Sequence, residues 1–452
     1  MLKNSQLSRE GIRERKMTNR NQLNIGVLLY GCGHHQAAWL MPDSTIEDIG
    51  ESSYYQHLAQ IAEAGYLDAV FFADNQSFPA KNATDLPAFW LDPLVNLTAI
   101  SQVTEYIGLV STISSTFSNP YTAARQLLSL DHVAKGRVGW NLVTSMTDWE
   151  ALNHGLDALP PREERYKKAE EFAILMEKLF LSWDQAYFLA DRSDNLLIEP
   201  EKIQAIHHTG TYFSVKGPLS TPRSPQGKPV AMQAGASEQG IALASKHADA
   251  VYSVAWNFRQ AHAFREKLHK QIKQSESPNR KIKIYPGLVT YVGKTREEAL
   301  AKKAELDEKL PVENALKQLS FFLQQDCSDW QLDEKIPTLP RIEEFSGPIG
   351  RYQTILEIIE DTEPTLKELL GYLAAGGGHL TLIGTPTEIV DQMGFWFNEG
   401  VADGFNLMPP SLPSSLEDFV DMIVPELQRR ELFKDTYTGT TLREHLGVAK
   451  VE

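Results

Sequence analysis

The sequence predicts an α/β fold, specifically a (β/α)8 TIM barrel with insertions, and three observations predict it. Short apolar segments alternate with longer amphipathic ones, which implies parallel strands joined by right-handed helical crossovers. The sequence has about eight strand-helix units with one long interruption, and a barrel of this type consists of eight such units. Polar residues also follow several successive strands. A doubly wound open sheet is the competing architecture.

The strands of the first half are short and apolar, and turn residues bound them. We expect them at residues 24–30, 68–73, 107–112 and 136–145. Amphipathic helices are predicted at 53–64, 93–105, 120–133 and 162–183. Gly65 ends the first of these helices, because glycine is favoured where a helix stops. A small hairpin is expected near 207–215.

The second half repeats the pattern and then interrupts it. Strands are predicted at 229–233, 250–254, 282–292, 379–383 and 404–408, the last two counted as the seventh and eighth of the barrel. Helices are predicted at 237–247, 258–273, 295–308, 385–398 and 416–430. Residues 309–378 mix helical and loop signals and end on three glycines, Gly376 to Gly378. No Lys-Ser/Thr pair follows these glycines, so we interpret them as a flexible joint rather than a phosphate-binding loop.

Composition limits the classes of function. The chain has 452 residues, 42% of them hydrophobic, and a formal net charge of −15. This charge disfavours binding to nucleic acid or to an anionic membrane, and no apolar run approaches the length of a membrane span. The two cysteines, Cys32 and Cys327, favour a reducing cytoplasm over a disulfide framework. We expect a disordered lead-in at residues 1–22 and one domain at 23–447 with an insertion at about 309–378.

Residues 136–145 are the most informative stretch of the chain. We expect Val138, Trp140, Leu142 and Val143 to be buried in the sheet. Asn141, Thr144 and Ser145 would present an amide and two hydroxyl groups at the carboxyl end of this strand. An ordinary core strand followed by a polar loop would give the same ten residues. Other strands end in a similar way. The further polar or reactive residues at predicted strand ends are Cys32, His34, His35, Asp74, Asn75, Gln76, Thr112 to Thr116, Gly235 and Ser237.

The residues after the first two strands each allow two interpretations. His34 and His35 could be metal ligands, but adjacent histidines point apart on an extended chain and spacing suggests no third ligand. We expect one of them to contact substrate and the other to pack. Cys32 is interpreted as a small lining residue rather than a nucleophile, since no partner base can be placed. Asp74 either caps the next helix or bonds a nearby amide, or it fixes the polar edge of a ligand ring.

The segment Gln233-Ala234-Gly235-Ala236-Ser237 predicts an anion site. Gly235 lets the backbone approach a ligand closely. Ser237 begins a helix, and the free N–H groups and dipole of a helix N-terminus favour an anion such as phosphate. Serine is also a common helix N-cap, and both roles can hold at once.

Several segments together resemble the bacterial-luciferase-like flavin monooxygenases, and within them the nitrilotriacetate and dibenzothiophene-sulfone monooxygenase branch. The resemblance runs from Leu23 to Gly447. The segments that carry it are 136–145, Phe71-Phe72-Ala73-Asp74, Ser129-Leu130-Asp131-His132, Gly217-Pro218-Leu219, Pro222-Arg223-Ser224-Pro225-Gln226-Gly227, Gln233-Ala234-Gly235-Ala236-Ser237 and Thr441-Leu442-Arg443.

The resemblance implies a two-component monooxygenase. Such an enzyme receives reduced FMN from a separate flavin reductase, reacts it with O2 to a C4a-hydroperoxide, and so oxidises a small organic substrate. We expect an organosulfur or amine-type substrate, no metal, and a homodimer or homotetramer. Substrate specificity is expected to come from His34, His35, Trp39 and the insertion at 309–378, because loops vary while the barrel stays fixed.

The resemblance also assigns roles to individual residues. Asp74 and Thr112 would approach the flavin ring, with Asn141 beside it. Tyr166 would hold the ribityl-phosphate side, and Ser237, with Gly235 before it, the phosphate. The catalytic candidates are His34, His35 and Asn141.

Two positions depart from the pattern of the branch. Arg162 stands where the branch usually has histidine, and its fixed charge could still contact FMN. Ile241 follows Gly240 where an arginine is often found.

Two other classes of function remain open. A deazaflavin-dependent oxidoreductase shares the luciferase-like barrel and would transfer hydride without O2. A non-catalytic flavin-binding protein would hold FMN without turnover.

Overall fold

The computed structural model describes residues 22–78, 91–235, 237–345 and 349–451. Residues 1–21 of the predicted lead-in and Ala236 of the predicted anion site lie outside the described residues. Within the described ranges, no helix is both long and apolar enough to cross a membrane.

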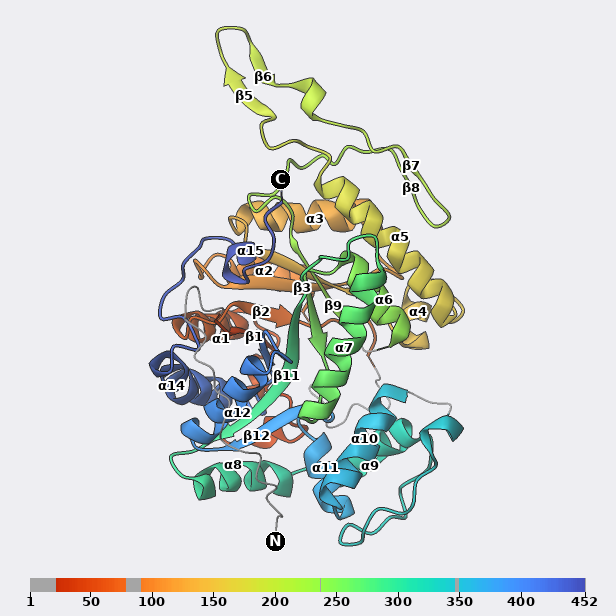
Figure 1. Cartoon of the computed structure of the whole chain (residues 1–452), viewed down its shortest axis with the longest axis vertical. Coiled ribbons are helices and arrows are strands. Elements are labelled where there is room, and N and C mark those ends of the chain that lie inside the picture. The colour runs from red at the N-terminus through yellow and green to blue at the C-terminus, as the bar shows by residue number, and fades with distance from the viewer. Residues whose placement is uncertain (1–21, 79–90, 236, 346–348, 452) are drawn as a thin grey trace.

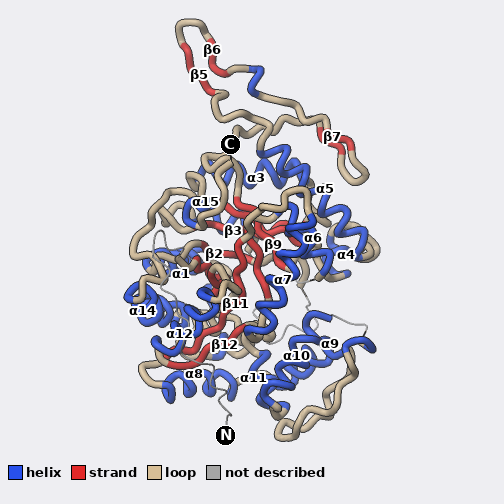
Figure 2. Tube along the Cα trace, in the orientation of Figure 1, coloured by secondary structure: helices blue, strands red, loops and turns tan. Residues whose placement is uncertain are grey.

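Parallel strands close into a barrel at the centre of the molecule, with helices around it (Figure 2). Each strand pairs with the next in the order β1, β2, β3, β4, β9, β10, β11, β13, and β13 returns to β1. The eight strands are β1 Asn24–Leu28, β2 Ala69–Phe72, β3 Gly108–Ser114, β4 Val138–Val143, β9 Val230–Ala234, β10 Ala250–Ser253, β11 Lys283–Val292 and β13 Gly404–Leu407. The predicted (β/α)8 barrel is therefore confirmed, and the open sheet is excluded.

One strand assignment was wrong. Residues 379–383 were counted as the seventh strand of the barrel, but β12 (Leu380–Gly384) pairs only with the second half of β11. The first half of β11 pairs with β10, and Gly287 and Leu288 pair with β13. The seventh barrel strand is therefore β11, and β12 extends the sheet beyond the barrel wall.

Helix starts follow the capping residues of the sequence. Asp92 and Asn119 cap α2 and α3, each with proline as the first helical residue, and Thr385 and Glu388 form a capping box at α12. Helix α2 ends at Ile100, five residues before the predicted end. The helices outside the late insertion are α1 Ser52–Ala64, α2 Pro93–Ile100, α3 Pro120–Val133, α4 Asp148–Asn153, α5 Arg162–Phe180, α6 Glu238–His247, α7 Phe258–Gln274, α8 Arg296–Glu308, α12 Pro386–Asn398, α13 Ser414–Asp418, α14 Val424–Arg429 and α15 Leu442–His445.

The short C-terminal helix α15 closes the amino-terminal end of the barrel. Leu442 and Leu446 belong to the same buried cluster as the inward residues of β2, β3, β9 and β10. Gly108 and Gly139 leave the room for this plug, since a Cβ atom on them would lie 2.4 and 3.1 Å from the Leu442 methyl carbons. In the part of the chain that the structure describes, α15 therefore leaves the opposite, carboxyl-terminal mouth for a ligand, and the predicted strand-end residues lie there.

Two segments extend beyond the barrel (Figure 1). An arm carries the hairpins β5–β6 (Phe188–Asp191 and Leu196–Ile198) and β7–β8 (His208–Thr209 and Ser214–Val215), of which only the second was predicted. The helices α9 (Val312–Leu323), α10 (Ile349–Thr362) and α11 (Leu366–Leu373) form a group with its own buried apolar cluster around Tyr352. These three helices fall inside the predicted insertion, and their last turn leads directly to the three glycines above the barrel.

Candidate active site at the mouth of the barrel

Thr112 and Asn141 form a hydrogen-bonded pair at the carboxyl ends of β3 and β4. The strands pair in register at these two residues. The amide Nδ2 of Asn141 donates to Thr112 Oγ1 over 3.2 Å, and Thr112 Oγ1 donates to the Phe72 carbonyl over 2.9 Å. The amide oxygen of Asn141 is buried and has no hydrogen-bond partner among the described residues. Such an orphaned acceptor is costly, so the pair is suited to receive an N–H group of a ligand.

The backbone after β4 is strained. Ser145 has a positive φ of 56°, which is rare for a residue other than glycine and is common at binding sites. Its hydroxyl lies 2.9 Å from Ser114 Oγ. The guanidinium of Arg165 donates to the carbonyls of Thr144, over 3.2 Å, and of Ser145. Arg165 thus clamps this loop, a role that sequence reasoning missed.

Ser237, Tyr166 and Arg162 lie together at the N-terminus of α6. Ser237 Oγ caps the helix by accepting from Gly240 N over 3.1 Å, and it lies 3.3 Å from the Tyr166 hydroxyl. Arg162 is exposed, with its guanidinium 5.9 Å from the centre of the Tyr166 ring. The helix dipole, two hydroxyls and a fixed positive charge favour an anion here. Gly235 lies half-buried just before this helix.

Asp74 lies half-buried just beyond the end of β2. Its Oδ2 accepts from Gln76 Nε2 over 3.0 Å. Burial raises the pKa of Asp74, and the nearby carboxylates Asp92 and Glu150 raise it further, against the lowering effect of Gln76. This carboxyl group therefore holds a proton more readily than an exposed aspartate does.

The two adjacent histidines have different environments. His34 donates from Nε2 to the Leu28 carbonyl over 3.1 Å, which leaves Nδ1 with the lone pair, and its ring stacks on Tyr30 at 5.3 Å. His35 uses both ring nitrogens within the protein. Its Nδ1 accepts from Ala37 N and its Nε2 lies 3.1 Å from the carboxylate of Asp307 on α8. His35 therefore packs and fixes the loop, whereas His34 keeps one nitrogen available for a ligand.

Protonation of His34 is expected to destabilise the fold in acid. Burial lowers the pKa of His34 to about 4, although the Leu28 carbonyl opposes the shift. The unfolded chain, with a histidine pKa near 6.5, binds this proton first, so stability falls as pH drops from about 6.5 to 4. Wild type should lose up to about 3 kcal/mol over this range relative to His34→Gln. Urea unfolding of both proteins at pH 7 and pH 4 measures the difference, and parallel losses would contradict the assignment.

Two further residues at the mouth, His379 and Arg351, were missed by sequence reasoning. The His379 ring lies over Gly287 of β11, so closely that a Cβ atom there would be 2.2 Å from His379 Nδ1. Arg351, on α10, donates to the Gly377 carbonyl. Gly376, Gly377 and Gly378 all have positive φ, so the glycine run bends the chain back over the mouth. That glycine run was the available signal, since a chain reversal places the residues next to it near the strand ends.

Cys32 is fully buried, and burial raises the pKa of its thiol. It is therefore a weak nucleophile, in keeping with the lining role expected from the sequence. Among the described residues, no group of three or more His, Cys, Asp and Glu side chains could hold a metal ion.

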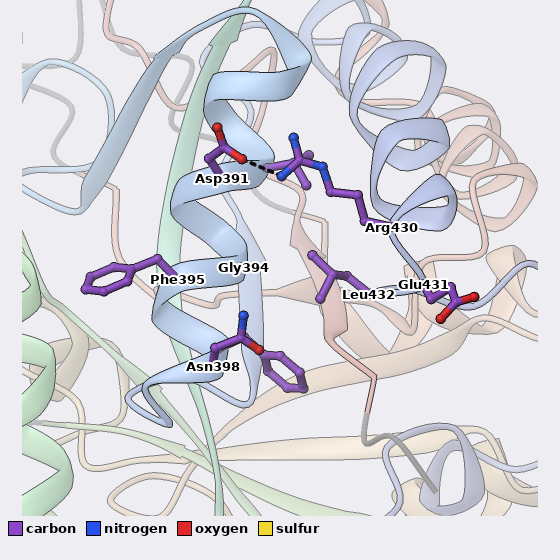
Figure 3. A pocket seen from close by; sticks show the side chains of 9 residues that line it. Asp391, Gly394, Phe395, Asn398, Arg430, Glu431 and Leu432 are labelled. Atoms are coloured by element: carbon purple, nitrogen blue, oxygen red, sulfur yellow. Dashed lines mark hydrogen bonds and ion pairs between the residues drawn. The ribbon is translucent and has the colours of Figure 1, made fainter. Parts of the chain in front are cut away.

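A separate groove of about 490 Å³ lies on the outer wall of the molecule (Figure 3). Its residues come from α12 and from the end of α14, and Arg430 spans it with an ion pair of 2.5 Å to Asp391. None of the residues that line it belongs to a barrel strand. This groove is therefore distinct from the site at the mouth.

Known proteins resemble this chain along nearly its whole length. The family model of the luciferase-like monooxygenases matches residues 30–403. N-acetyl-S-(2-succino)cysteine monooxygenase of Bacillus subtilis is 38% identical, over 96% of this chain and 98% of its own length. Nitrilotriacetate monooxygenase component A of Aminobacter aminovorans is 37% identical, over 95% and 97%. The crystal structure of DmoA from Hyphomicrobium sulfonivorans is similar with a TM-score of 0.84 at 30% identity, covering 94% of this chain and 92% of the other.

Proposed function

Because this chain belongs to the luciferase-like monooxygenase family, we propose that it is the oxygenase of a two-component system that uses reduced FMN and O2. Its substrate is a small organic molecule of the organosulfur or amine type. The similar proteins include one named for a thioether substrate and one named for an amine, nitrilotriacetate. The second is named as component A of its enzyme, which supports a separate flavin reductase as partner of this chain.

The observation that carries the proposal is that two different polar sites lie on one side of the mouth. The orphaned amide oxygen of Asn141 would accept from an N–H of the flavin ring, beside Thr112 and Asp74. The N-terminus of α6, with Ser237, Tyr166 and Arg162, would hold the phosphate. FMN carries both of these groups, a polar ring edge and a terminal phosphate.

The protein residues would position the reactants and exclude water. Reduced FMN, when bound, supplies the electrons that activate O2. Below the mouth, the rings of Phe71 and Tyr252 stack with their centres 4.7 Å apart and form an aromatic floor beneath the site, above the α15 plug. An apolar floor excludes water and strengthens the polar contacts above it. His34 is neutral near pH 7 and offers Nδ1 as a hydrogen-bond acceptor at the β1 side of the mouth.

Binding of the two redox forms of FMN tests the proposal. Fluorescence titration with oxidised FMN, and then anaerobically with reduced FMN, is expected to show tighter binding of the reduced form. With a flavin reductase and NAD(P)H, substrate-dependent O2 uptake should follow. Binding of a deazaflavin in place of FMN would favour the hydride-transfer alternative. FMN binding without O2 uptake for any thioether or amine would favour a non-catalytic flavin-binding protein.

Replacement of Asn141 by leucine is expected to disturb flavin placement while the fold stays intact. The leucine has a similar volume, but it removes the orphaned acceptor and the donor to Thr112 Oγ1. We expect FMN affinity to fall about tenfold, as for the loss of one or two buried hydrogen bonds. FMN titration and thermal unfolding of the variant give the two readouts. Full activity of the variant would remove Asn141 from the site.

We expect this protein to form a homodimer or a homotetramer and to act in the cytoplasm. The low cysteine content and the family support these assignments. Size-exclusion chromatography with light scattering measures the oligomeric state. Fractionation of the native cells shows the compartment.

A further inference from the structure

We propose that the mouth of the barrel carries a binding site for a carboxylate of the substrate, formed by Arg351 with His379 and His34 beside it. The inference rests on the proposed function and narrows its substrate to organosulfur or amine compounds that bear a carboxylate.

The guanidinium of Arg351 lacks an acidic partner. It lies half-buried on the first turn of α10, and its Nη1 donates to the Gly377 carbonyl and lies 3.5 Å from the Gly376 carbonyl. Burial lowers its pKa, and no acidic neighbour contributes a compensating shift. No ion pair of Arg351 occurs among the described residues. A half-buried charge of this kind normally has a counter-ion.

The donors of Arg351 that remain are the ones a carboxylate would use. Its Nε and Nη2 have no hydrogen bond to any described residue, so one edge of the planar fork is available. That edge matches a carboxylate in a bidentate pair. Arg137 provides the contrast, because it is also buried without a salt bridge but makes five hydrogen bonds to oxygen atoms. Arg137 is therefore satisfied by the fold. Arg351 has, among the described residues, only the two glycine carbonyls and the Phe322 ring, whose centre lies 5.9 Å from its guanidinium carbon.

Three loops bring this charge to the barrel mouth. His34 N donates to the Pro409 carbonyl over 2.9 Å, and Gln36 N donates to the Ala374 carbonyl over 3.1 Å. The loops after β1 and β13 thus meet the glycine run that carries His379. A Cβ atom on Gly376 would lie 2.7 Å from Met408 Cε and 3.6 Å from His379 Cδ2. The site therefore occupies the β1, β11 and β13 side of the mouth, whereas the proposed flavin site occupies the β2, β3, β4 and β9 side.

His379 adds a second unsatisfied group. Its Nδ1 is buried and has no hydrogen-bond partner in the described ranges. Burial lowers the pKa of His379, and the nearby Arg351 and His34 lower it further. The chain as a whole carries a net charge of −15, which repels anions at long range. A carboxylate would therefore be recognised by this local cluster rather than by the overall field.

Succinate and its neutral analogue succinamide test the proposal with the full-length protein. Isothermal titration should show succinate binding to wild type at least about tenfold more tightly than succinamide, since only the carboxylate pairs with the guanidinium. Arg351→Gln should abolish this preference, and His379→Asn should reduce it. Arg296→Gln, on the exposed face of α8, is the matched control and should keep it. Thermal unfolding identifies any variant that does not fold.

Equal affinities for the two probes in wild type, or no binding of either, would overturn the proposal. So would an unchanged preference in a folded Arg351→Gln protein. FMN titration of the same samples separates this inference from the proposed function. A wild-type protein that binds FMN but does not prefer succinate refutes the carboxylate site alone. One that prefers succinate but binds no FMN refutes the flavin assignment alone.

Discussion

Replacing Ser237 with aspartate is expected to lower the affinity for FMN by about 100-fold or more and to leave the affinity for riboflavin nearly unchanged. Aspartate is as good a helix N-cap as serine, so it should preserve the bond to Gly240 N and the start of α6. Its carboxylate would then stand where the phosphate is expected. Two like charges about 4 Å apart near a protein surface repel by roughly 4 kcal/mol, which accounts for the size of the effect.

Fluorescence titration of both flavins measures this prediction. Ser237→Asn is the matched control, because asparagine also caps a helix but carries no charge. It should lose only a few-fold in FMN affinity. Ser237→Ala should cost roughly 1 kcal/mol of FMN binding through the lost contact. If Ser237→Asp binds FMN as wild type does, the phosphate does not lie at α6.

Replacing Gly404 with alanine is expected to lower the free energy of unfolding by about 3 kcal/mol or more, near the upper end for overpacking of a core. Gly404 is the first residue of β13 and pairs with Asn24 of β1, where the last strand of the barrel meets the first. A Cβ atom at Gly404 would lie 1.9 Å from the Asn24 carbonyl oxygen. This oxygen belongs to the backbone, which cannot rotate away as a side chain can. The strands β1 and β13 must therefore move apart where the barrel closes.

Urea unfolding followed by circular dichroism measures the loss. Gly350→Ala is the control, because Gly350 is exposed in the first turn of α10 and a Cβ atom there meets nothing within 4 Å. This variant should be unchanged or more stable by up to about 1 kcal/mol, since alanine favours helix. Equal free energies of unfolding for the Gly404→Ala and wild-type proteins would contradict this prediction, because β13 could then shift without loss of stability.

The barrel could be predicted from the sequence because its signals are local. Apolar strands, helix caps such as Thr385 with Glu388, and the alternation of the two element types each depend on a few neighbouring residues. The identity of the seventh strand could not be predicted in this way. Residues 282–292 and 379–383 both have a strand pattern, and only long-range pairing decides that β11 continues the wall while β12 lies beside it. The β5–β6 hairpin was missed because its residues are exposed and lack a clear alternation.

Many residues of the segments that carry the family resemblance have structural roles. Asp131 accepts from Val138 N over 2.8 Å and from Gln226 Nε2 over 3.0 Å, and so holds the start of β4. Arg443 pairs with Asp249 over 3.0 Å and ties α15 to the barrel. Such segments identify the fold and the family, but they say little about the substrate.

Residues of the candidate site could be predicted only where they lie in the carboxyl half of a strand or directly after it. Asn141 and Thr112 belong to that class, and the structure places them side by side. Arg351 comes from a helix of the insertion, more than 50 residues after the end of β11. No local pattern marks such a residue, because its place depends on how α10 packs and on where the glycine run turns.

The plug formed by α15 has a consequence for how the chain is synthesised. Leu442 and Leu446 complete the interior of a barrel whose first strand begins at Asn24. The residues of the plug are therefore made only after all eight strands of the barrel. The growing chain must hold an unfilled barrel until these two leucines have been made, and a ribosome stalled near residue 440 would display a protein with all eight barrel strands but without the plug.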